Sequence, residues 1–212
     1  LFLITTQIIF SQSILGSFYN LSNQSIKLEG FVGLKKYAIS STTTDEKGNF
    51  NLNYSKQDYG VGYLIASDNK PFFILLSGED IVITGESLNV TETIKVKKGK
   101  ENQYFEKYAQ EHPRREQALS AWGYLEKIYT LDSLFSSQKI PSQAIQDEKQ
   151  RIKKEDLAFL SSLPNDSYVK WFLPTRKLVS SVSTVAQYRP EEISETIDAF
   201  RKLDYSDARL YK

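Results

Sequence analysis

The sequence predicts an α+β fold, in which an N-terminal antiparallel β-sandwich or partly open barrel is followed by an all-α helical region. Nine of the ten glycines lie at or before Gly99, whereas five of the six prolines lie after it. Short runs of alternating apolar residues fill the first half, and apolar residues three or four apart fill the second. We therefore expect a partial signal peptide at residues 1–13, a β-rich domain at 14–100 and a helical region at 101–212.

The first ten residues, LFLITTQIIF, are apolar except for Thr5, Thr6 and Gln7, and Ser11-Gln12-Ser13 follows as a small-x-small pattern. This arrangement is typical of the apolar core and cleavage site of a secretory leader. The run is too short to span a bilayer, and a buried first strand is the alternative interpretation. We expect the printed sequence to begin inside the leader of an exported protein of the periplasm or cell envelope. The leader has no lipobox cysteine, which argues against a lipid anchor.

The β-rich half contains about seven to nine short strands, a spacing typical of a sandwich or barrel. Asp45-Glu46-Lys47-Gly48 has an acid that opens a turn and a glycine three residues later, which predicts a type I turn and a hairpin. A calcium loop at this turn would need more acidic ligands at regular spacing. Gly78-Glu79-Asp80 is predicted as a second tight turn. The predicted strands are Ile26–Phe31, Tyr37–Ser40, Asn49–Tyr54, Val61–Ala66, Phe72–Leu76, Ile81–Thr84 and Thr93–Val96.

The second half has four helical patterns. Apolar residues from Leu119 to Phe135 recur every three or four positions and define one helix face. Pro141 opens the next helix, and we expect a third helix to be kinked or split at Pro174. Arg189-Pro190-Glu191-Glu192 has an early proline and acids in the first turn, which predicts the start of the last helix.

Composition excludes several classes of function. The formal net charge is +1, from 27 basic and 26 acidic residues, so we expect no nucleic-acid binding. Lysines at 95, 97, 98 and 100 alternate with apolar residues and are interpreted as a solvated strand face. With no cysteine, the chain lacks disulfides, thiol chemistry and zinc-cysteine sites. With His112 as the single histidine, a two-histidine metal site is excluded, and we expect no His-based triad. We predict no cofactor and no structural metal.

Paired acids are the first candidates for hydrolytic chemistry. Glu79-Asp80 lies in a predicted turn, where adjacent acids commonly face water. Asp147-Glu148 and Glu155-Asp156 lie among lysines and arginines on a predicted helix, which indicates ordinary helix-surface ion pairing. Two acids that work as acid and base need environments that separate their pKa values, and the sequence shows no such environment. His112 precedes Pro113 and is interpreted as a capping or surface residue at a helix-helix joint, with proton transfer as the alternative.

Aromatic residues are the remaining candidates for ligand contact, since the chain holds 13 tyrosines and 12 phenylalanines. Four of them sit together in the β-rich half and are candidate contacts for a ligand or partner: Tyr59, Tyr63, Phe72 and Phe73. Aromatic strips on sandwiches stack sugars or hold peptides, but core and edge packing is the alternative.

The pattern resembles a known family. DEKGNF (Asp45–Phe50) and PFFILLSGEDIVITGE (Pro71–Glu86) resemble the N-terminal DUF4369-like domain of TlpA-like thioredoxin-family proteins from Bacteroidetes envelopes. ENQYFEKYAQEHP (Glu101–Pro113) and YVKWFLPTRKLVSSV (Tyr168–Val182) resemble the helical connector that precedes the thioredoxin fold there. In that family a Cys-x-x-Cys pair in a C-terminal domain performs the chemistry. The resemblance implies that this chain is an accessory region and carries no catalytic residue.

Three hypotheses follow. The first is a non-catalytic accessory region that positions or partners a thioredoxin-like domain of the same protein, in a thiol-disulfide oxidoreductase. The second is a stand-alone envelope module that binds a glycan, a peptide or an envelope protein through its exposed aromatics. The third is a hydrolase, which requires Glu79 or Asp80 to line a deep pocket.

Overall fold

A computed structural model describes residues 11–33, 35–67, 70–138, 141–188 and 193–212. The chain divides into two compact units. The β unit consists of the described residues up to Tyr104, together with Ser180–Lys212. The helical unit is Phe105–Val179. The first ten residues of the predicted leader lie outside the described residues, whereas Gln12 and Ser13 are paired within the first strand.

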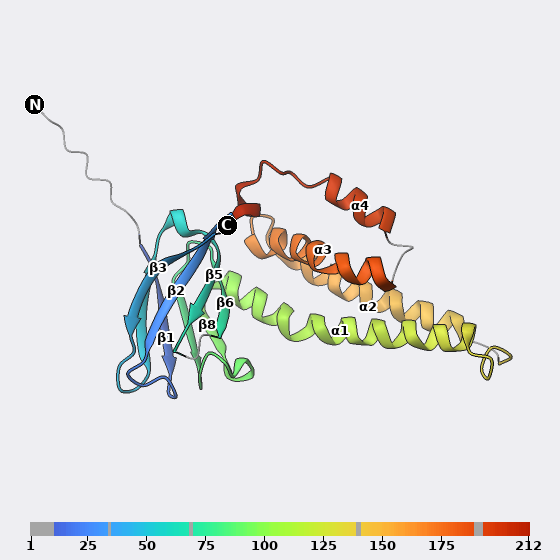
Figure 1. Cartoon of the computed structure of the whole chain (residues 1–212), viewed down its shortest axis with the longest axis horizontal. Helices are drawn as coiled ribbons and strands as arrows, with labels where there is room; N and C mark the ends of the chain where they lie inside the picture. The colour runs from blue at the N-terminus through green and yellow to red at the C-terminus, as the bar shows by residue number, and fades with distance from the viewer. Residues whose placement is uncertain (1–10, 34, 68–69, 139–140, 189–192) are drawn as a thin grey trace, which may run out of the picture. The chain divides into compact units, whose positions relative to one another are not determined.

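The β unit contains two four-stranded sheets (Figure 1). One sheet has the order β4-β1-β7-β8 and the other β3-β2-β5-β6. The chain changes sheet after β1, β3, β4 and β6, so neighbours in sequence are often not neighbours in a sheet. The strands are β1 (Gln12–Phe18), β2 (Ser25–Val32), β3 (Lys35–Thr43), β4 (Asn49–Tyr54), β5 (Gly60–Ile65), β6 (Pro71–Leu76), β7 (Ile81–Gly85) and β8 (Lys95–Lys98).

The predicted α+β class is confirmed, and the sheets are open rather than closed into a barrel. The strand ladders are antiparallel except for one. β1 and β7 pair in parallel, with Ile14 opposite Ile81 and Phe18 opposite Gly85. Parallel pairing requires a long crossover between the two strands. Here β2 to β6 supply it, which is why short-range sequence patterns did not reveal it.

The turn at Asp45–Gly48 forms as predicted, but the hairpin prediction is wrong. Asp45 accepts hydrogen bonds from the backbone of Lys47 and Asn49, and Gly48 has a φ of 77°. A side chain at Gly48 would collide with the carbonyl of Phe18, so the turn needs glycine for two reasons. The strands on either side, β3 and β4, belong to different sheets, so the turn is a corner between them.

Alternating side chains of the two sheets meet in one apolar core. In β4, for example, Phe50, Leu52 and Tyr54 are buried while the asparagines between them face water. The period of two places every second side chain on the core side of the sheet. Other members of the core are Ile14, Phe18, Leu28, Leu64, Ile74, Leu76, Ile81 and Ile83.

The side chain of Asn102 pairs with the backbone of Leu75 at the edge of β6. Its side-chain Oδ1 accepts a hydrogen bond from the Leu75 N–H at 2.9 Å, and its Nδ2 donates to the Leu75 carbonyl at 2.8 Å. Asn102 is only 5% exposed, so these bonds form away from water. One amide side chain therefore completes the hydrogen bonding of one residue of an edge strand.

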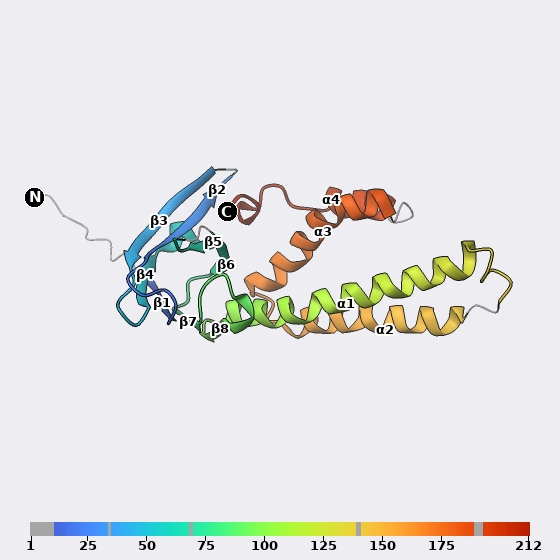
Figure 2. The ribbon, with the colours of Figure 1, turned by 60° about the horizontal axis from the view of Figure 1, so that its bottom comes forward.

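Four helices follow the strands: α1 (Lys100–Leu131), α2 (Ser142–Ser162), α3 (Tyr168–Tyr188) and α4 (Ile193–Arg201). Both views show α1 and α2 running side by side (Figures 1 and 2). Pro141 precedes α2 as predicted, whereas the predicted start of the last helix at residues 189–192 lies outside the described residues. Among the described helices, none has a stretch apolar and long enough to cross a membrane.

Two helix predictions are corrected. α1 continues through Pro113, so His112 lies inside a helix and not at a joint between helices. α3 continues through Pro174 and is not split there. A proline inside a helix removes one N–H donor and crowds the preceding turn, so each position costs helix stability that packing must offset.

Candidate functional site

Glu79 and Asp80 both serve the structure of the β unit. A carboxylate oxygen of Glu79 accepts the Glu101 N–H in the first turn of α1. Asp80 accepts both the N–H and the hydroxyl of Ser13 and pairs with Lys98 at 3.0 Å. The Ser13 N–H, with help from Lys98, lowers the pKa of Asp80. Such a carboxylate is held ionised, which does not suit a general acid.

The other acidic pairs lie on α2, as predicted. Glu148 binds Arg151 at 2.7 Å on the outer side of the helix, which is ordinary support between neighbouring turns. Glu155 and Asp156 differ, because both also contact Arg115 of α1. The Glu155-Asp156 pair therefore joins two helices, which the interpretation as a surface pair did not foresee.

The four aromatic candidates divide between the two faces of their sheet. Tyr59 and Phe72 pack against the apolar core. Tyr63 and Phe73 are cross-strand partners in β5 and β6, on the face away from the core, with ring centroids 6.1 Å apart. Phe31 of β2 extends this row, with its ring 5.5 Å from that of Tyr63. The structure thus brings two of the four together and adds one residue that the sequence did not single out.

The Lys36 ammonium lies 6.0 Å from the centroids of both Phe31 and Tyr63. This is the outer limit of an attractive contact between a cation and a ring. We call Phe31, Lys36, Tyr63 and Phe73 the aromatic row. It combines apolar ring surface with one positive charge.

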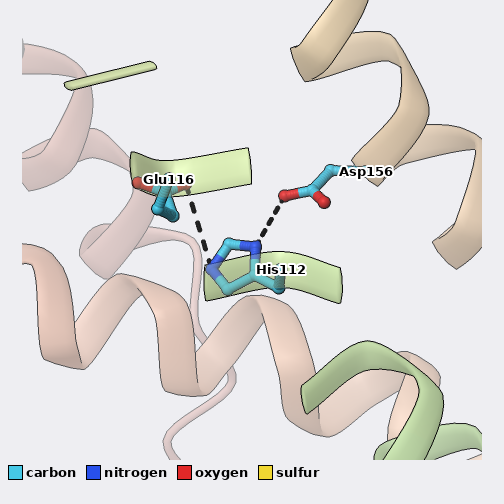
Figure 3. Close-up of side chains that lie close together, drawn as sticks. All are labelled: His112, Glu116 and Asp156. Atoms are coloured by element: carbon cyan, nitrogen blue, oxygen red, sulfur yellow. Dashed lines mark hydrogen bonds and ion pairs between the residues drawn. The ribbon is translucent and has the colours of Figure 1, made fainter. Parts of the chain in front are cut away.

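A second group of polar residues lies in the helical unit and includes the single histidine. His112 and Glu116 are one turn apart on α1, and Asp156 comes from α2 (Figure 3). These three residues each offer a ligand atom within 4.8 Å of the others. We call them, together with Arg115 and Lys177, the His112 cluster.

The contacts of His112 indicate which nitrogen of the imidazole ring carries the hydrogen. His112 Nδ1 lies 2.8 Å from Asp156 Oδ2, whereas Nε2 lies 3.9 Å from Glu116 Oε1 (Figure 3). An ionised carboxylate only accepts hydrogen bonds, so Nδ1 carries the hydrogen in this contact. A neutral His112 therefore directs the lone pair of Nε2 toward the side of Glu116. The Tyr108 ring stacks on the imidazole at 4.5 Å and fixes its plane.

Two cations balance the carboxylates of the His112 cluster. Arg115 contacts Glu111 at 2.6 Å, Asp156 at 3.2 Å and Glu155 at 3.4 Å. Lys177 of α3 lies 3.1 Å from Glu116 and 3.6 Å from Asp156. The cluster thus ties three helices together by charge. Burial raises the pKa of the stacked Tyr108, and the charge of Asp156 adds to that increase.

An Asp-His pair is the arrangement that orients imidazole as a general base in hydrolases. In the His112 cluster, however, the free nitrogen faces a carboxylate and not a hydroxyl nucleophile. The described contacts therefore support cation binding or helix clamping better than nucleophilic catalysis. The sequence did not group these residues, because a joint between helices was expected at His112. The contribution of Asp156, 40 residues later than Glu116, depends on the packing of α2 on α1.

Comparisons with known proteins give no support to any particular function for the His112 cluster. No protein-family model and no curated protein matches the chain. Among solved structures, a 9R-lipoxygenase from Cyanothece PCC8801 matches with 20% identity and a TM-score of 0.27. The match covers 39% of this chain and 18% of the lipoxygenase chain. A similarity this weak carries no argument about fold or function.

Proposed function

We propose that this chain is a non-catalytic accessory region of an exported thiol-disulfide oxidoreductase of the TlpA-like thioredoxin family, which it serves as scaffold or partner-binding part. The observation that carries the proposal is the structural use of the candidate catalytic acids. Glu79 holds the start of α1, Asp80 joins β1 to β8, and Asp156 joins α2 to α1. Acids engaged in this way support the fold, which is what we expect of an accessory region.

The C-terminal residues are bound to two connections of the β unit. The Gly33 N–H, in the connection between β2 and β3, donates to the Tyr211 carbonyl at 2.7 Å. Lys212 Nζ donates to the Gln57 carbonyl at 3.4 Å. A thioredoxin-like domain joined after Lys212 would therefore start beside the β unit, which suits a region that positions its partner.

The test begins with the reading frame beyond the codon for Lys212. We expect a Cys-x-x-Cys pair in a following domain. A stop codon directly after Lys212 would contradict the proposal, as would hydrolytic turnover by purified chain of this length. The full protein should reduce a disulfide substrate, and replacement of both cysteines of the pair should abolish this activity.

A second function is favoured by the aromatic row, namely a stand-alone envelope module that binds a glycan or peptide. Rings on one sheet face beside a cation are suited to stack on a sugar or an extended peptide. The variant Tyr63→Ala should lose retention on immobilised envelope glycan or peptide, whereas the core variant Phe72→Leu should keep it. Equal retention by wild type and Tyr63→Ala would exclude this function.

A further inference from the structure

The ion pairs around the His112 cluster involve more carboxylates than cations, although the cluster itself has two of each. Glu111, Glu116, Glu155 and Asp156 contact Arg115 or Lys177, and Arg151 is shared by Glu155 and Glu148. Arg176 adds one more positive charge near the stacked Tyr108, which leaves five carboxylates against four cations. A neutral imidazole adds no charge. Negative charge in excess at a partly buried place attracts a further cation, because the surrounding protein screens it less than water does.

We propose that His112 Nε2 and Glu116 form a Zn²⁺ site, with Asp156 as the outer residue that orients the imidazole. Imidazole nitrogen and carboxylate oxygen are both ordinary ligands of this metal. Histidine ligands of metals commonly donate their second N–H to a carboxylate, which fixes the tautomer and raises ligand basicity. His112 makes this contact with Asp156 at 2.8 Å in the structure.

The distances require little movement. Bonds of about 2.0–2.1 Å in a tetrahedral arrangement place two ligand atoms about 3.3 Å apart. Nε2 and Glu116 Oε1 are 3.9 Å apart, so a small rotation of the glutamate brings them into range. His112 is 17% exposed and Glu116 31%, so water can reach the site and occupy the remaining coordination positions.

Lys177 competes with this metal for the carboxylate of Glu116. Its ammonium lies 3.1 Å from Glu116 Oε1, the same oxygen that would bind Zn²⁺. Lys177 is 49% exposed, so its side chain can turn into solvent when a divalent cation takes its place. Replacing one positive charge with two also relieves the excess of carboxylates. The site therefore exchanges an internal ammonium for an external metal ion.

The test uses the fact that the chain has one histidine. In ¹⁵N-labelled chain without an affinity tag, the imidazole nitrogen signals come from His112 alone. Titration with ZnCl₂ should shift the Nε2 signal and leave Nδ1 protonated. Imidazole signals that stay unchanged at saturating Zn²⁺, or a shift at Nδ1 in place of Nε2, would overturn the proposal, even if calorimetry detected Zn²⁺ bound elsewhere.

Variants separate a built site from general acidity. Asp156→Asn should weaken Zn²⁺ binding about 10- to 100-fold, the usual effect of losing an orienting carboxylate. Lys177→Ala should strengthen it about fivefold, the upper range for removal of an exposed ion pair. Glu148→Gln, on the same helix as Asp156 but outside the cluster, should leave affinity unchanged. Lys177→Ala removes a half-exposed side chain and serves as the second variant if Asp156→Asn unfolds, and unchanged affinity in Lys177→Ala would refute the exchange.

Discussion

Each of the two units of this protein is stabilised internally by a different kind of interaction. In the β unit, fully buried side chains such as Phe18, Leu28 and Leu64 from both sheets form one apolar core. In the helical unit fewer apolar residues are fully buried, among them Ile145, Ile152, Leu163, Val169 and Leu173. Its helices share the charges of the His112 cluster instead. The difference teaches that strand ladders around a core tolerate changes of salt and pH, whereas a helix bundle joined by ion pairs responds to both.

The two units can be followed separately by spectroscopy. Both tryptophans, Trp122 and Trp171, lie in the helical unit. Tryptophan fluorescence therefore reports the helical unit, and amide hydrogen exchange of the strands reports the β unit.

The largest expected effect is in the β core. Leu64→Ala removes a fully buried side chain of β5 and leaves a cavity. We expect a loss of about 2–5 kcal/mol in the unfolding free energy of the β unit. Strand hydrogen exchange under urea should show the loss, whereas Leu134→Ala, at a highly exposed position, should leave it unchanged. A Leu64→Ala chain with unaltered strand protection would mean that the core does not hold the β unit together.

The next effect concerns the edge of β6. Asn102→Ala leaves the buried N–H and carbonyl of Leu75 without these partners. An unsatisfied buried polar group costs about 1–3 kcal/mol, so we expect a loss of about 2–3 kcal/mol. The amide of Leu75 should then exchange faster. Gln103→Ala, whose side chain makes only exposed bonds, is the matched control and should behave as wild type.

The helical unit should respond to Asp156→Asn. The change weakens the contacts of Asp156 with His112, Arg115 and Lys177 while it keeps the side-chain shape. Because Asp156 is 13% exposed, the loss should exceed that of a surface ion pair, at about 1–2 kcal/mol. Tryptophan fluorescence should detect it, with Glu148→Gln showing no measurable change. A matching loss in strand protection would contradict separate stabilisation of the two units.

The smallest effect is the pH dependence of the β unit. The pKa of Asp80 is lowered in the folded chain, so its contribution to stability is fully present above 3.8, the ordinary pKa of this carboxyl group in an unfolded chain. It is lost as the pH falls from there through the lower folded pKa. Asp80→Asn should flatten the pH dependence of β-unit unfolding below about pH 4. Acid titration that gives the same curve for both proteins would show that Ser13 and Lys98 do not hold this carboxylate in the folded state.

Local pattern predicted strands at the places of β2 to β8, but it predicted neither β1 nor the arrangement of the strands. Asn49–Tyr54 was predicted with the bounds that β4 has, because its alternation is strict. The hairpin at Asp45–Gly48 was not found, since a turn defines local direction but not the sheet that each strand joins. The parallel pairing of β1 with β7 likewise depends on contacts between residues far apart in the sequence and not on any short segment.

The candidate site shows the same limit. The proline after His112 suggested a joint between helices, whereas α1 continues through Pro113 and places His112 and Glu116 one turn apart. Asp156 was predicted as a surface acid because its neighbours in sequence are charged. The role of Asp156 depends on its contact with α1, and no residue near it in the sequence predicts that contact. Similarly, Phe72 and Phe73 look alike in sequence, and only the direction of β6 decides which one faces the core.

The amide of Asn102 has a consequence for self-association. An edge strand with unpaired backbone groups is a template on which a second chain can add its own strand. At Leu75 that position is already taken by the two atoms of one side-chain amide. Asn102 therefore blocks the addition of a further strand at Leu75, which is one position along the edge of β6.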